Sequence, residues 1–412
     1  MPSKHLKFAV LLAVVGLVAM LISRRIDGTS QLKYETEYKS DSLPAPAVSI
    51  RLAGPEELVL SADAPHCAET DEWGKRMDVP DAPLRAVRWR DEILAVAAHY
   101  NNLAYYTRSL KNLERRDCHS LLKSRKDPNP CAFADHEWLI SLYISDDRLF
   151  GLIHNEYWGG LYDRECRERL GKRVPWASVC LYVNLTGAVS EDGRQFIRKG
   201  IVAAYPYPFS SDMKRNGVRD PTNLFRNPKD NHVYFLAWVD PYNDQKGGKC
   251  LFRSKDPFSD PWLVWDGKGF NHSMGSPCEG EKHKRVLCQP VSGLGITTVV
   301  YYEPSQTFIG LVFDERISPG GIFYRTSPDL IHWSRAEFLM EGHDFKHWKK
   351  RGAEAPIIFP SLIDPESRSA NFDMIGDHPY LYFMRARVKD GVALGRKRDI
   401  LRRPLVILPL KP

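Results

Sequence analysis

The sequence has 412 residues, of which 43% are hydrophobic and 11% aromatic, enough to bury a large core. The net charge is +7, a modest value for this length, and basic and acidic residues are interleaved over most of the chain. The sequence contains no zinc-finger spacing, RNP motif or helix-turn-helix pattern, so nucleic acid is excluded as an expected partner.

An apolar run lies close to the N-terminus. FAVLLAVVGLVAMLI (residues 8–22) follows two lysines and precedes two arginines, with no small-residue cleavage site at its end. Such a run is short for a spanning helix and long for the core of a signal peptide. We expect residues 1–25 to form an uncleaved transmembrane signal anchor, which makes the membrane a partner. The rest of the chain is then expected outside the cytoplasm, in a periplasm, in a secretory lumen or at a cell surface.

Residues 26–70 are rich in Ser, Pro, Ala and charged residues, which is typical of a stalk or linker, with one strand expected at residues 48–52. All eight cysteines lie beyond the apolar run and none forms a CxxC pair. An even number of cysteines in an exported chain predicts disulfides rather than a metal site. Cys166 with Cys180 and Cys250 with Cys288 are the first expected pairs, and the connectivity otherwise stays open.

Residues 71–412 show an all-β pattern, in which short aromatic and β-branched runs alternate with Gly, Pro, Asp and Asn. Five units begin near residues 81, 135, 217, 275 and 360, each with a polar start, a first strand, a turn and a strongly apolar second strand. Three corners recur where a third strand would turn into a fourth: SEDGRQF (190–196), SKDPF (254–258) and TSPDLIHW (326–333). Two apolar strands per unit would also suit a β-sandwich, but the recurring corners favour a five-bladed β-propeller over residues 71–412.

Carboxylates stand at the starts of several units. The first strand of each propeller blade lines the central axis, so side chains at these starts would converge on the mouth of the funnel. Asp81, Asp220 and Glu279 occupy this position in three units, as does Asp135 or Glu137 in a fourth. Asp81 and Asp220 also lie close to prolines, a common turn composition. Repetition of the carboxylate nevertheless predicts a shared site.

Two motifs resemble those of known enzymes. TSPDLIHWS (326–334) is similar to a strand-turn corner, and VRDPTNLF (218–225) to the RDP motif, of five-bladed propeller glycoside hydrolases, namely the arabinanase/β-xylosidase and invertase/levansucrase groups. The likeness covers about residues 75–405 in architecture, but identity is confined to short motifs. It implies that Asp81 is the base or nucleophile, Asp220 the stabilising aspartate and Glu279 the general acid. PDAP replaces the invertase NDPNG, and HNEYWG (154–159) fits neither group, which suggests an uncharacterised exported branch.

Glu156 is the rival candidate for the acid, because a charge on an apolar strand needs a partner or a funnel. Polar side chains that end or follow apolar second strands predict a sugar-binding floor, to which aromatic rings add stacking surfaces. The predicted binding residues are His99, His154, Tyr157, Trp238, Tyr242 and Arg385. The histidines show no metal-ligand spacing, so no metal and no cofactor are expected, although a calcium ion in the funnel stays an open alternative.

The sequence therefore predicts an exported, membrane-anchored glycoside hydrolase that cleaves a poly- or oligosaccharide with carboxylates in the funnel. The alternative is a non-catalytic propeller that binds a carbohydrate or an envelope partner, since a fold alone does not fix an activity.

Overall fold

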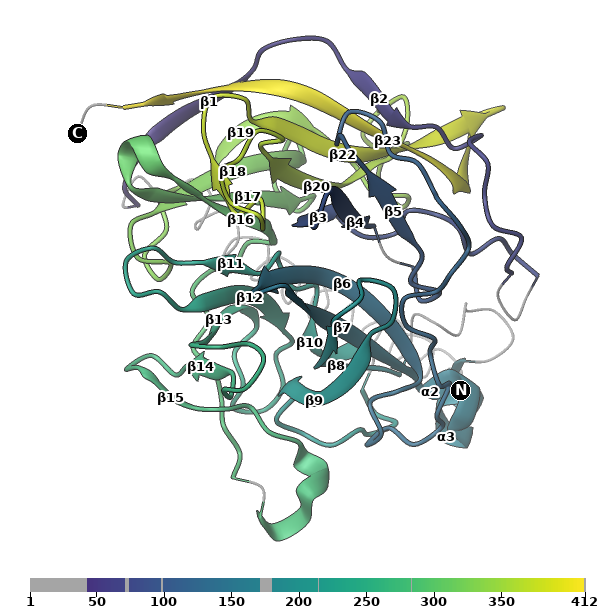
Figure 1. Ribbon diagram of the computed structural model, residues 1–412. Helices are drawn as coiled ribbons and strands as arrows, with labels where there is room; N and C mark the ends of the chain where they lie inside the picture. Colours follow the sequence, from purple (N-terminus) through teal and green to yellow (C-terminus); the bar gives the residue numbers. More distant parts are fainter. Residues whose placement is uncertain are drawn as a thin grey trace, which may run out of the picture.

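The computed structural model describes residues 43–70, 74–97, 99–170, 180–213, 215–282 and 284–410. The regular secondary structure of these residues is almost entirely β-strand, which confirms the predicted all-β class (Figure 1). The predicted anchor, residues 1–25, lies outside the described residues. Among the helices that are described, none is both long and apolar enough to cross a membrane.

The strands lie in four sheets and fall into five mainly antiparallel groups, two of which share one sheet. The first group holds β3 (Arg85–Trp89), β4 (Glu92–Val96) and β5 (Ala104–Thr107). The second holds β6 (His136–Ser145), β7 (Arg148–Trp158), β8 (Leu181–Ser190) and β9 (Ile197–Ala203). The third holds β10 (Arg215–Arg219), β11 (Phe225–Arg226), β12 (Val233–Val239), β13 (Gly248–Ser254), β14 (Leu263–Trp265) and β15 (Phe270–His272).

The fourth group holds β16 (Ile296–Tyr302), β17 (Thr307–Asp314), β18 (Gly321–Ser327) and β19 (Glu337–Glu341), with β21 (Met374–Ile375) added in parallel to β16. The fifth holds β20 (Ile357–Ile363), β22 (Tyr380–Lys389) and β23 (Val392–Pro409). Short helices α2 (Gly159–Tyr162) and α3 (Arg164–Leu170) follow β7, and a 3-10 segment spans Pro277–Lys282. Parallel pairing of β8 with β10 joins the second and third groups into one sheet.

Hydrogen bonds tie each group to the next and the fifth to the first. The bonds run from Ser361 Oγ to Leu84 O (2.9 Å), Thr297 Oγ1 to Pro360 O (3.1 Å), Val299 N to Asn223 Oδ1 (2.9 Å), Leu224 N to Ser141 Oγ (3.0 Å) and Leu139 N to Asn102 Oδ1 (2.6 Å). Polar side chains thus satisfy backbone groups that the sheets leave unpaired where two groups meet. The segments that start each group are therefore held close to one another.

The SEDGRQF and TSPDLIHW corners lie between the third and fourth strands of their groups, as predicted. SKDPF lies between β13 and β14, which are a third and a fourth strand when β10 and β11, both paired with β12, are counted as one. In each, an aspartate carboxylate accepts hydrogen bonds from backbone N–H groups that follow it. Asp192 Oδ1 binds Arg194 N (2.8 Å), Asp256 Oδ1 binds Phe258 N (3.0 Å) and Asp329 Oδ1 binds His332 N (2.8 Å). These local hydrogen bonds hold each turn in shape independently of packing in the core, which explains why the Ser-acidic pattern recurs.

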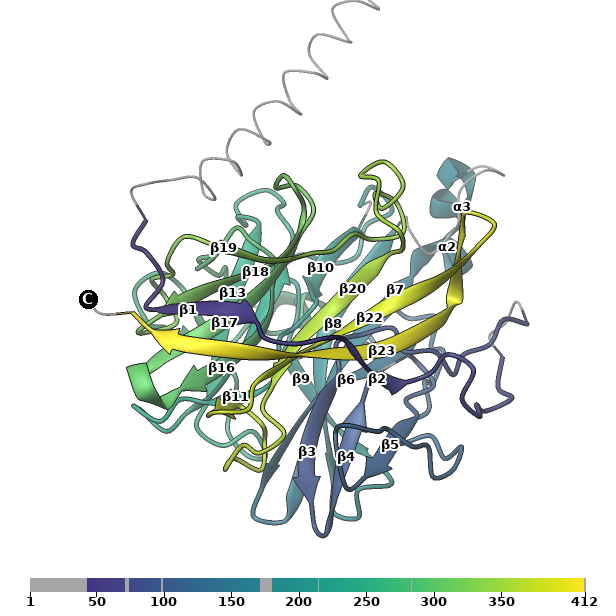
Figure 2. The ribbon, with the colours of Figure 1, turned by 90° about the horizontal axis from the view of Figure 1, so that it is seen from above.

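The two ends of the described chain meet in the fifth group. β1 (Val48–Leu52) and β2 (Glu57–Leu60) both pair antiparallel with β23 (Figure 2). The strand predicted at residues 48–52 is present, but it belongs to a sheet rather than to a stalk. The described part of segment 26–70 therefore differs from the predicted linker. The physical reason is that Val48 and Ile50 alternate inward and are buried in the core.

Four disulfides link all the cysteines of the chain, in the pairs Cys67–Cys118, Cys131–Cys278, Cys166–Cys180 and Cys250–Cys288. Both pairs expected from the sequence are confirmed. Disulfides persist in oxidising compartments, so these bonds indicate an environment outside the cytoplasm.

The Cys131–Cys278 disulfide allows a test of loop closure. Both cysteines are exposed and 147 residues apart, so their replacement by alanine changes little packing and opens a long loop. We expect the free energy of unfolding to fall by about 5 kcal/mol. Urea unfolding of the double variant would measure this loss. Opening the 14-residue Cys166–Cys180 span should remove about 3 kcal/mol of loop-closure free energy, before the packing of these buried cysteines is counted. A loss below 1 kcal/mol for the exposed pair would contradict the prediction.

Candidate functional site

One cavity of about 680 Å³ receives residues from all five groups. The first group contributes Asp81, and the second contributes Trp138, His154 and Glu156. The third contributes Arg215, Arg219, Asp220, Trp238 and Lys249, the fourth Thr297, Asp314, Glu315 and Arg316, and the fifth Phe359 and Pro360. His347 lines the cavity from the turn between β19 and β20. The lining thus combines carboxylates, cations and indole rings, a mixture suited to a polar ligand that also has apolar faces.

Asp81 lies in the segment before β3, where its backbone N–H donates to Ala97 O (3.1 Å). Its carboxylate forms an ion pair with Arg398 of β23, and about a quarter of the side chain is exposed. The arginine therefore fixes the position of the Asp81 carboxylate at the edge of the cavity.

Asp220 directly follows β10, and its φ of 49° places it in the left-handed region. Its carboxylate is paired with Arg219, and Arg215 Nη2 lies 3.9 Å from Oδ1. Arg219 also binds Asp240, with Nη2 2.9 Å from Oδ1. Lys249 Nζ reaches the same corner from β13 and donates to Asp220 O (2.5 Å). Asp220 is thus held by three cations, although 49% of its side chain remains open to the cavity.

These contacts set the charge states at the corner. Burial opposes the ionisation of Asp220, but the charges of Arg219 and Arg215 outweigh it and hold the pKa below its usual range. Burial lowers the pKa of Lys249 to about 7, although Asp220 acts in the opposite direction. Burial also lowers the pKa of His154, against the charges of Glu156 and Asp220. Asp220 is therefore an anion at any physiological pH, whereas Lys249 can change its charge there.

Glu156 and His154 lie on β7 and face the cavity together, because alternate residues of a strand share a face. Glu156 Oε2 accepts a hydrogen bond from Trp158 Nε1 (3.0 Å), and its Oε1 lies 3.8 Å from His154 Nε2. Glu156 has no arginine or lysine among these partners. It therefore lies in the cavity without an arginine or lysine paired to it, unlike Asp81 and Asp220.

Trp238 lines the cavity as predicted, but arginines occupy its surroundings. Arg219 and Arg316 each place their guanidinium carbon 5.6 Å from the ring centroid, and Nε1 donates to Asp240 (3.0 Å). Trp138 of β6 is a second indole in the lining that sequence reasoning did not select.

Glu279 is not brought to the cavity. It is exposed in the 3-10 segment, next to the Cys131–Cys278 disulfide, and the first strand of its group begins only at Ile296. The predicted unit start near residue 275 therefore falls in a connecting segment. Thr297 stands at the cavity instead, so this group provides no carboxylate at the start of its first strand.

Four predicted binding residues also lie elsewhere. Tyr157 points to the opposite face of β7 from Glu156, and it packs on Tyr162 and Phe209. His99 is buried against Trp138 and lies 3.0 Å from Arg396 Nη1.

Tyr242 is an exposed ring that packs on Tyr207, and Arg385 forms an ion pair with Glu56 in a separate recess. Tyr242 lies in the loop after β12. Arg385 lies within β22, the second strand of the fifth group, and its side chain is not part of the cavity lining.

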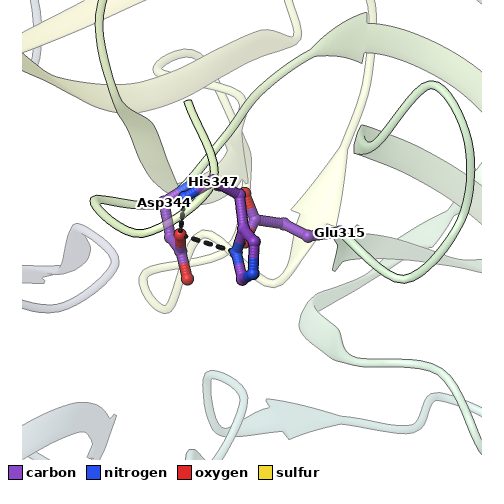
Figure 3. Close-up of side chains that lie close together, drawn as sticks. All are labelled: Glu315, Asp344 and His347. Atoms are coloured by element: carbon purple, nitrogen blue, oxygen red, sulfur yellow. Dashed lines mark hydrogen bonds and ion pairs between the residues drawn. The ribbon is translucent and has the colours of Figure 1, made fainter. Parts of the chain in front are cut away.

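A cluster of possible metal ligands lies at the fourth group. Glu315, Asp344 and His347 each offer one ligand atom, and these atoms lie within 4.8 Å of one another (Figure 3). Glu315 and His347 also line the cavity. Sequence reasoning overlooked this cluster, although His343 and His347 are four residues apart. Lys249 was missed too, although a lysine within the apolar run of β13 was a signal.

No family model matches the sequence, and no curated protein is significantly similar to it. Among solved structures, a family 117 glycoside hydrolase of Zobellia galactanivorans is 11% identical, with a TM-score of 0.47 over 87% of this chain and 90% of its own. An α-L-arabinanase of Cellvibrio cellulosa, solved with arabinohexaose, is 10% identical, with a TM-score of 0.45 over 81% of this chain and 92% of its own. Both structures are named as glycoside hydrolases or arabinanases, and their likeness to this chain is a distant one.

Proposed function

We propose that this protein binds a poly- or oligosaccharide in the cavity and hydrolyses a glycosidic bond. The observation that carries the proposal is that Asp81, Glu156 and Asp220, from three different groups, line one open cavity together with Trp138 and Trp238. Glycosidic hydrolysis needs a protonated carboxylic acid at the leaving oxygen and an ionised carboxylate on the other side of the sugar ring. Indole rings provide the apolar faces on which sugars stack.

The partners of each carboxylate suggest its role. Asp81, paired with Arg398, serves as the base or nucleophile. Asp220, held as an anion by Arg219, stabilises positive charge that develops on the sugar and raises the proton affinity of a nearby acid. Glu156, which has neither arginine nor lysine among its described contacts, serves as the general acid.

The five tied groups support a five-bladed β-propeller as the architecture of this site. An anchor formed by residues 1–25 would hold it at a membrane, outside the cytoplasm.

A second function, non-catalytic binding of a carbohydrate, is favoured by one specific observation. Both Asp81 and Asp220 are already engaged by arginines, which reduces their freedom to act on a substrate. In this function the carboxylates and arginines of the cavity recognise hydroxyl groups and no bond is cleaved.

Singly substituted variants separate the two functions. The full chain should first be screened against plant, bacterial and animal polysaccharides for release of reducing ends and for binding. We expect Asp81→Asn and Glu156→Gln each to lower turnover by about 10²- to 10⁴-fold while carbohydrate affinity changes little. Glu279→Gln is the matched control and should behave like the parent. Turnover retained in both cavity variants would reject the roles proposed for Asp81 and Glu156, and binding without turnover in the parent would reject hydrolysis and establish the second function.

A further inference from the structure

The cluster of Glu315, Asp344 and His347 brings together groups that usually ligate metals. Glu315 directly follows β17, whereas Asp344 and His347 belong to the turn after β19 (Figure 3). His347 Nδ1 lies 2.6 Å from Glu315 Oε2 and 2.9 Å from Asp344 Oδ1. One imidazole nitrogen thus faces two carboxylate oxygens from separate segments. The His347 side chain and the carboxylates of Glu315 and Asp344 therefore converge on one point.

A fourth polar group, His343, lies beside the cluster. It is 1% exposed, and its Nε2 lies 3.1 Å from Glu341 Oε1. A carboxylate only accepts hydrogen bonds, so Nε2 is the donor in this contact. Nδ1, on the other side of the ring, has no hydrogen-bond partner and lies 3.6 Å from Glu315 Oε1. A buried imidazole nitrogen without a partner is unfavourable, and a cation bound by Glu315 would lie close to it.

We propose that Glu315, Asp344 and His347 form a binding site for a divalent transition-metal ion of the zinc type, with His343 beside Glu315. An imidazole nitrogen and carboxylate oxygens suit Zn²⁺, whereas Ca²⁺ takes six to eight oxygen ligands. Zinc–ligand bonds of about 2.0–2.2 Å put neighbouring ligand atoms of a tetrahedral site about 3.3 Å apart. The two separations at His347 Nδ1, 2.6 and 2.9 Å, are somewhat shorter than that value.

Surrounding groups already orient the ligands. Asp344 Oδ1 accepts hydrogen bonds from the backbone N–H groups of Lys346 (2.7 Å) and His347 (2.9 Å). The backbone N–H of Asp344 donates to Glu315, and Glu341 orients His343. Such contacts around a metal site fix the direction of each ligand and are worth about 10- to 100-fold in affinity. Metal binding would displace the proton of His347 Nδ1 and link the fourth group to the turn that precedes β20.

Metal titration of the full chain, without an affinity tag, tests the site. Zn²⁺ should bind one per chain in competition with a chromogenic chelator, and Co²⁺ should give visible absorption bands of a tetrahedral complex. His347→Gln and Glu315→Gln should each weaken Zn²⁺ binding at least tenfold. His332→Gln is the matched control, because Asp329 and His332 form the same pair three residues apart (2.7 Å) but are not part of any described ligand cluster. It should bind Zn²⁺ like the parent.

Circular dichroism of each variant shows whether the fold is kept, and a weakened site in a folded His347→Gln protein supports the proposal. Zn²⁺ binding that is unchanged in both His347→Gln and Glu315→Gln would overturn it. So would the absence of Zn²⁺ binding at micromolar concentration, or Ca²⁺ and Mg²⁺ displacing Zn²⁺ at equal concentration. These measurements use no carbohydrate, so their outcome is independent of whether the protein hydrolyses a glycosidic bond.

Discussion

Replacing Asp220 by asparagine is expected to lower turnover by about 10²- to 10³-fold, the usual effect of removing one group that stabilises charge in a transition state. The substitution keeps the size of the side chain and removes its charge. Asparagine is among the residues that best tolerate the left-handed backbone found here, so the turn should persist. Because Arg219 retains Asp240 as a partner, the cation should stay in place. The loss of turnover would then be due to the missing carboxylate charge and not to a rearrangement of the residues around position 220.

Asp390→Asn is the control for replacing an aspartate by asparagine at a residue with a left-handed backbone conformation. Asp390 is exposed, has a φ of 50° and lies at the turn between β22 and β23, outside the cavity lining. Its variant should match the parent in turnover on the polysaccharide identified by screening and in thermal unfolding. Turnover of Asp220→Asn within threefold of the parent would show that the Asp220 carboxylate has no part in the reaction.

Lys249→Met should make the stability of the protein less dependent on pH. Lys249 is 2% exposed and its pKa in the folded protein is about 7, whereas the unfolded chain has a value of about 10.4. Between these values the unfolded state binds more protons, so the parent gains stability as the pH rises. Below pH 7 the parent carries a buried charge that methionine lacks. The variant should therefore be more stable at pH 6 by several kcal/mol, on the order of 4.

Urea unfolding at pH 6, 7.5 and 9 measures this difference. The advantage of the variant should shrink by about 2–3 kcal/mol between pH 6 and pH 9, because the parent loses its buried charge over that range. Lys246→Met, at an exposed position of the preceding turn, should show no pH-dependent difference from the parent. An advantage of Lys249→Met that is the same at all three pH values would mean that Lys249 keeps an ordinary pKa.

Local signals in the sequence were sufficient to predict most of the strands and the turns that cap them. The Ser-acidic corners are capped by their own aspartates, such as Asp256, so the pattern and the turn coincide. Strand alternation places His154 and Glu156 at the cavity, and the same rule, if applied, would have excluded Tyr157. Asp81 and Asp220 line the cavity because Asp81 lies a few residues before β3 and Asp220 directly follows β10.

The remaining site residues depend on contacts between distant segments. Glu279 was misplaced because a connecting segment separates it from β16, a length that the repeat pattern did not reveal. Arg398 reaches Asp81 across 317 residues, and Glu315 meets His347 across 32. Such pairs form only when whole groups pack together, and a single sequence carries no pattern that specifies them.

The pairing of β1 with β23 has a consequence for biosynthesis. Val48 lies opposite Pro409, so the first described strand to leave the ribosome waits for the last one before its sheet is complete. During translation the four other groups must stay compact, or be protected, while β22 and β1 lack their neighbour β23. A nascent chain stalled before residue 392 would expose an unpaired strand edge on both sides of this gap.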